Sequence, residues 1–62
     1  MSEAPQLSSI ASALTDLTER VAAIAEGLGG TDRDGVASAL YEVERALLTG
    51  SRRLDEVLRA MR

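Results

Sequence analysis

The apolar residues of this chain recur in a seven-residue pattern on both sides of a Gly-Gly pair. Before the pair, alternating steps of three and four residues separate Leu7, Ile10, Leu14, Leu17, Val21, Ile24 and Leu28. After the pair, the same steps continue through Val36, Leu40, Val43, Leu47, Gly50, Leu54, Val57 and Met61. Such steps place residues on one face of an α-helix. The spacing therefore predicts two amphipathic helices that pack along these two rows.

Local signals set the expected ends of the first helix. Pro5 fits in a first helical turn, where its missing N–H is not needed. Gly29 and Gly30 follow the last apolar residue, and glycine readily adopts the left-handed conformation that ends many helices. We therefore expect the first helix over residues 5–28.

The second helix is expected to begin after a short loop. Thr31 and Asp34 have the spacing of an N-terminal capping box, which indicates a loop at 29–31 and a second helix over 32–60. A loop this short makes the two helices antiparallel. The expected fold class is all-α: a single domain over residues 1–62, built as an antiparallel two-helix hairpin of the coiled-coil type.

A hairpin of this size is expected to leave apolar surface open. Folding about residue 30 extends the end of the second helix beyond the start of the first, and further small or apolar residues flank the two rows. Each of the two helices buries only one stripe, so a 62-residue monomer is expected to be only marginally stable. We expect homodimerisation into a four-helix bundle. The residues expected at the interface are Tyr41, Leu48, Leu58, Val57, Met61, Ala22 and Ala25.

Composition argues against several classes of function. The net charge is -3, all 7 basic residues are Arg, and Cys and His are absent. An acidic chain is a poor nucleic-acid binder, and the absence of Cys and His removes disulfides and the common zinc sites. No apolar run is long enough to span a membrane, and the N-terminal region has no basic residue of a secretory signal. A cytoplasmic location is expected.

The sequence offers little for catalysis. Its Ser and Thr residues have no His to activate them, and neither Cys nor Lys is present as a nucleophile. A two-helix unit is also expected to lack a concave pocket. We therefore expect a protein that is not an enzyme, with no catalytic residue, no metal site and no cofactor.

A row of arginines allows two interpretations. Arg45, Arg52 and Arg59 recur every seven residues along the second helix. The row could bind an acidic partner or an anionic ligand, or it could be a solvated face with intrahelical pairs such as Arg52 with Glu56. The basic segment 51–62 lacks Trp and Phe, so binding to a membrane surface is not expected.

One segment carries a resemblance to other proteins. Residues 40–47, which read Leu-Tyr-Glu-Val-Glu-Arg-Ala-Leu, are followed by Arg52, Arg53 and Leu54. This pattern resembles short uncharacterised helical-hairpin proteins of GC-rich bacteria. The resemblance implies a bacterial protein with an antiparallel hairpin, and it implies no activity.

These observations favour a small non-enzymatic oligomerisation or protein-interaction module whose partner is a second copy of itself. One alternative is a regulatory adaptor that docks on a helix of a transcription or cell-division factor. The other is a binder of an anionic ligand held by the arginine row, between Arg45 and Arg52 of two subunits.

Overall fold

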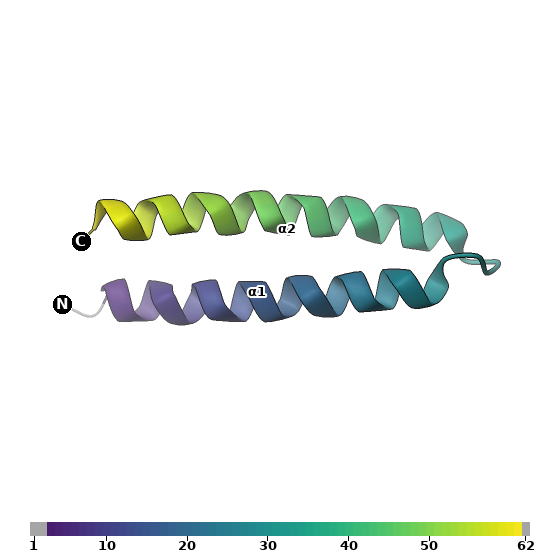
Figure 1. Cartoon of the computed structure of the whole chain (residues 1–62), viewed down its shortest axis with the longest axis horizontal. Coiled ribbons are helices and arrows are strands. Elements are labelled where there is room, and N and C mark those ends of the chain that lie inside the picture. The colour runs from purple at the N-terminus through teal and green to yellow at the C-terminus, as the bar shows by residue number, and fades with distance from the viewer. Residues whose placement is uncertain (1–2, 62) are drawn as a thin grey trace.

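The computed structural model describes residues 3–61 and consists of two helices joined by a short loop (Figure 1). Helix α1 spans Glu3–Leu28 and helix α2 spans Asp34–Ala60. They lie side by side and antiparallel in a rod 49 Å long (Figure 1). The predicted all-α hairpin is confirmed. Residues 1, 2 and 62 of the predicted domain lie outside the described residues.

The helix boundaries differ from the prediction by two residues at each helix start. Helix α1 begins at Glu3, so Pro5 lies within its first turn, where no intrahelical partner requires its N–H. Helix α2 begins at Asp34, and the loop is therefore 29–33. Glu3 and Asp34 each place a carboxylate in a first turn, where the helix dipole favours negative charge.

The loop is held by a set of local hydrogen bonds. Gly30 has a φ of 78°, so the left-handed conformation expected of the Gly29 and Gly30 pair is adopted by its second residue. The Thr31 hydroxyl donates to the Leu28 carbonyl and accepts a bond of 3.0 Å from the Arg33 N–H. The Asp34 carboxylate accepts from the Gly30 N–H. The chain therefore reverses direction within five residues.

Thr31 is not the N-cap that the capping-box spacing predicts. The residue preceding α2 is Arg33, and its side chain makes no capping hydrogen bond. The expected pair still acts in the turn, because Thr31 and Asp34 each accept a backbone N–H of the loop. This bonding keeps residues 32 and 33 in the turn and moves the helix start to Asp34.

The two helices contact each other along a seam that differs from the predicted one. In α1 the least exposed residues are Leu7, Ala11, Leu14, Thr18, Val21, Ala22, Ala25 and Leu28. In α2 they are Ala37, Leu40, Glu44, Leu47, Ser51, Leu54 and Leu58. We call these residues the seam. Every second predicted position is replaced by the residue that follows it in the sequence.

The displaced positions were expected to be core and are instead on the surface. They include Ile10, Leu17, Ile24, Val36, Val43 and Val57, all large and exposed. Met61, the last predicted core position, is exposed as well. Their replacements are mostly smaller: Ala25, Ala37 and Thr18 are the buried residues within 3–61. A small side chain lets two helices approach closely. The residues that belong to both the predicted and the observed seam can then pack against the backbone of the opposite helix.

The expected overhang of α2 is also absent. Helix α1 has 26 residues and α2 has 27, and the start of α1 lies beside the end of α2 (Figure 1). Val57 is exposed because it lies beside the seam, and Leu58 lies in the seam itself. Helix α1 therefore lies beside α2 along the whole length of α2. Whether a residue of α2 is exposed depends on the side of the helix on which it lies.

Candidate interaction surfaces

The seam divides the surface of the hairpin into two sides of different chemistry. In each helix a set of large apolar residues immediately precedes seam residues: Ile10, Leu17, Ile24, Val36, Val43 and Val57. Because the helices share one handedness and run antiparallel, residues that precede the seam on either helix lie on the same side of the pair. We call this set the aliphatic face.

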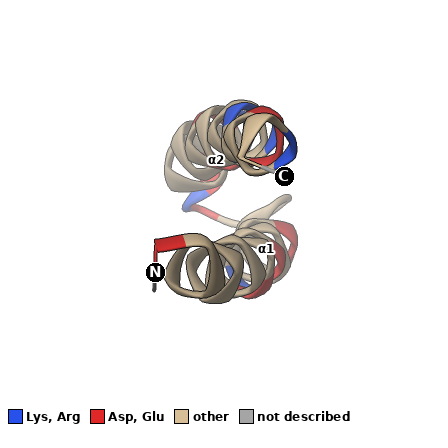
Figure 2. Cartoon of the chain, turned by 90° about the vertical axis from the view of Figure 1, so that its left-hand side faces the viewer, with Lys and Arg blue, Asp and Glu red and all other residues tan. Residues whose placement is uncertain are grey.

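The aliphatic face is large and nearly free of charge. Its six residues are 44 to 58% exposed. By the helical repeat, its outer margins carry the small residues Ala13, Gly27, Ala39, Ala46 and Ala60. Arg20 and Arg53 are the charged residues that share these margins. Viewed along the rod, the ribbons of both helices on the left are mostly uncharged (Figure 2).

The opposite side carries charges of both signs, including Asp55 beside the basic row of α2, and we call it the charged face. Its acidic residues on α1 are Glu19 and Glu26, and its basic residues on α2 are Arg45, Arg52 and Arg59. In Figure 2 the red and blue segments of the ribbons lie mainly on the right of the hairpin. Tyr41 and Leu48 project from α2 on this side, because each follows a seam leucine, and both are exposed.

An open hollow of about 400 Å³ lies on the charged face, contrary to the expectation that a two-helix unit lacks one. Its lining residues are Thr15, Thr18, Glu19, Ala22, Ala23, Glu26, Glu44, Leu48 and Ser51. Small residues in α1 leave this space, since they do not reach the opposite helix. The carboxylates do not converge, and no cluster of three acidic residues able to hold a metal ion occurs within residues 3–61.

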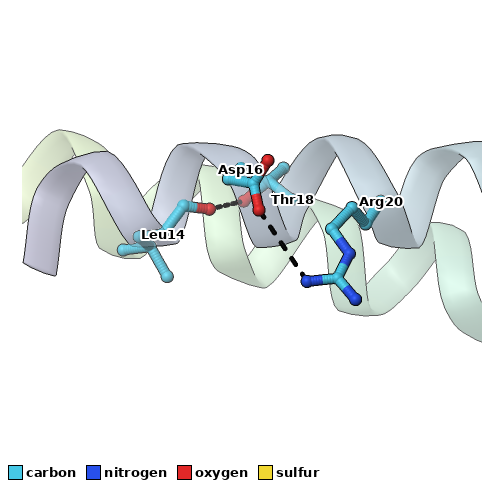
Figure 3. Close-up of polar contacts among 4 residues, drawn as sticks. All are labelled: Leu14, Asp16, Thr18 and Arg20. Atoms are coloured by element: carbon cyan, nitrogen blue, oxygen red, sulfur yellow. Dashed lines mark hydrogen bonds and ion pairs between the residues drawn. The ribbon is translucent and has the colours of Figure 1, made fainter.

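Outside the loop, the side-chain polar contacts within residues 3–61 are local to each helix. The Thr18 hydroxyl donates to the Leu14 carbonyl at 2.6 Å, which satisfies a buried hydroxyl inside the seam (Figure 3). Asp16 and Arg20 form an ion pair of 3.8 Å on the outer surface of α1 (Figure 3). Neither contact joins the two helices. Polar bonds therefore do not specify how α1 and α2 pack, and apolar contacts along the seam do.

The residues predicted at an interface fall into different environments. Four of them are exposed in the single hairpin, as residues of an interface between copies must be: Tyr41, Leu48, Val57 and Met61. Ala22 and Leu58 are half-buried in the seam. Ala25 is 0% exposed, so the expectation that it lies on an open flank is wrong: its small side chain is enclosed within the hairpin.

The arginine row lies on the surface of α2. Arg45, Arg52 and Arg59 are all exposed, and none of them forms an ion pair within the described part of the chain. The predicted pair of Arg52 with Glu56 is therefore not formed in this structure. Exposed guanidinium groups along one helix supply positive potential, but they do not enclose an anion.

The chain was compared with protein families, curated proteins and solved structures. No family model, no curated protein and no solved structure matches it. The resemblance to helical-hairpin proteins of GC-rich bacteria therefore stays a prediction. Within residues 3–61 no helix is long and apolar enough to cross a membrane.

Proposed function

We propose that this protein is a small non-enzymatic oligomerisation module that self-associates through its apolar surface. The observation that carries the proposal is the absence of a core of large side chains. Within residues 3–61 no large apolar side chain is fully buried, and the buried apolar residues are Ala25 and Ala37. Large side chains contribute most when fully removed from water, about 1.5–3 kcal/mol each.

The accessible surface supports the same proposal. The hairpin exposes 4661 Å², whereas a compact monomer of its 6.6 kDa mass exposes about 3,900 Å². The excess is about 800 Å², which is close to the area that each partner buries in a standard protein interface. Association of two hairpins would give each chain the burial that it lacks alone.

The test is whether folding depends on protein concentration. We expect the purified chain to have a sedimentation mass of at least twice 6.6 kDa at micromolar concentration. We also expect its melting temperature to rise with concentration, because association stabilises the folded state by mass action. A folded chain with a mass of 6.6 kDa and a melting temperature independent of concentration would contradict the proposal.

The adaptor hypothesis is the second candidate, and the charged face favours it. There, Leu48 lines the open hollow beside an acidic row and a basic row. A partner helix could place an apolar side chain in the hollow and its charges against the two rows. An adaptor is expected to be monomeric alone and to gain thermal stability with its partner, so the mass measurement on the pure chain separates the two functions.

A further inference from the structure

We propose that the aliphatic face is the dimer interface, and that a second copy of this chain covers it to form a four-helix bundle. This inference rests on the proposed self-association and assigns it to one side of the hairpin. The other exposed apolar residues, Tyr41 and Leu48, lie on the charged face and would stay outside this contact.

The width of the apolar stripe supports a bundle. A two-stranded coiled coil needs two apolar positions in seven, whereas a helix in a bundle core uses about three. In α1 the seam uses two apolar positions, such as Ala11 and Leu14, and Ile10 supplies the third. Helix α2 repeats this arrangement with Leu40, Ala37 and Val36. Each helix therefore has an apolar position beyond those that the hairpin itself uses.

The face can pair with a copy of itself. Its α1 row consists of Ile10, Leu17 and Ile24, and its α2 row consists of Val36, Val43, Gly50 and Val57. Rotation about a two-fold axis parallel to the rod would place the bulkier α1 row of one copy on the smaller α2 row of the other. A Cβ at Gly50 would meet no atom within 4 Å, so this position is open to a side chain from a second copy.

Charge and area also favour a second copy over another occupant. Apart from Arg20 and Arg53 at its margins, the face presents no charge that a foreign helix could recognise, whereas the charged face presents two rows. The face extends along both helices of the 49 Å rod, so an identical face matches it in length and width. The surface excess of about 800 Å² is close to the area that each partner buries in a standard interface.

Two leucines provide a matched test. Leu17 on the aliphatic face is 47% exposed, and Leu48 on the charged face is 48% exposed. The experiment measures sedimentation mass over protein concentrations from about 1 to about 500 µM, together with helicity. We expect Leu17→Glu to weaken the dimer about a hundredfold or more, because it buries an unpaired carboxylate, and Leu48→Glu to leave the mass unchanged.

The outcomes separate this inference from the proposed function. If the unaltered chain is a folded monomer, both fail. If the unaltered chain is dimeric and Leu48→Glu dissociates it while Leu17→Glu does not, self-association stands and the assignment to the aliphatic face is wrong. A dimer that survives both substitutions would also overturn the assignment.

A cross-linking experiment covers the case in which Leu17→Glu unfolds. The chain has no cysteine, so a pair of single-cysteine variants reports one contact. We expect Leu17→Cys mixed with Val43→Cys to give a disulfide-linked dimer on oxidation. The control mixture of Glu19→Cys with Arg45→Cys, on the charged face, should stay monomeric on a denaturing gel. Cross-linking of the control mixture alone would contradict the proposal.

Discussion

The alternate positions of the seam and the aliphatic face beside them are built from residues of mostly opposite size. Along the seam, Ala25, Ala37 and Thr18 are almost completely enclosed. On the aliphatic face, one residue away in sequence, Ile24, Val36 and Leu17 are about half exposed. The chain thus places small side chains at alternate positions of the seam and leaves the large residues that precede them on the surface. The apolar surface of a helix is therefore a poor guide to its nearest neighbour when small residues are also present.

Enlarging the seam should have the largest effect on stability. Ala25→Leu adds bulk at a position with 0% exposure, so the helices must separate. We expect a loss of about 1–3 kcal/mol in the free energy of unfolding, measured by urea denaturation at fixed protein concentration. Ala23→Leu is the control, because Ala23 is exposed two residues away. Equal effects of the two substitutions would show that the seam is not closely packed at Ala25.

The loop that joins α1 and α2 should tolerate substitution less well than an exposed helical position. Gly30→Ala forces a side chain into a φ of 78°, and we expect a loss of about 1 kcal/mol. Gly27→Ala is the matched control: its Cβ would meet no atom within 4 Å, and helix propensity should give a gain of about 0.5–1 kcal/mol. Thermal melts of both variants test this, and a gain at Gly30 would contradict the left-handed turn.

Removing the hydroxyl from the seam should have a smaller effect. Thr18→Val keeps the shape of the side chain and removes the 2.6 Å bond to the Leu14 carbonyl. That carbonyl also accepts a backbone bond within the helix, so we expect a change below about 1 kcal/mol. Thr18→Leu, which adds volume, should be clearly more destabilising. If urea denaturation shows the reverse order, bonding at Thr18 matters more than its size.

The outer surface of α1 should be the least sensitive region. Asp16 and Arg20 form an ion pair of 3.8 Å, and their side chains are 66% and 70% exposed. We expect Asp16→Asn to cost about 0.3 kcal/mol at low salt and less at high salt, because exposed pairs are screened. Thermal melts at two salt concentrations test this, and a loss above about 1 kcal/mol would mean that the pair is more constrained than its exposure indicates.

Helices and turn were predictable because their signals are local. Apolar spacing indicated two helices, and glycine chemistry indicated a left-handed residue in the Gly29 and Gly30 pair, which the structure has at Gly30. The two-residue differences at the starts of α1 and α2 arise from side-chain hydrogen bonds in the loop and from a first turn that accommodates Pro5. Such details depend on geometry that spacing does not encode.

The choice of seam was not predictable from spacing. The row of Leu7, Leu14, Val21 and Leu28 belongs to both the predicted and the observed contact. A stripe on either side of this row has the same alternation of three and four residues, so periodicity cannot distinguish them. Size favoured the wrong stripe, since large residues were expected inside. The available signal was the recurrence of Ala11, Thr18 and Ala25 at seven-residue intervals, which indicates close helix approach.

The short turn also has a consequence for the order of events in refolding. Because 29–33 close the chain within five residues, helix pairing requires no long loop to be ordered. Reversal of direction should take microseconds and should not depend on how many copies are present. Association of two copies is bimolecular, so it should follow as a separate kinetic phase. The rate of that phase should increase with protein concentration.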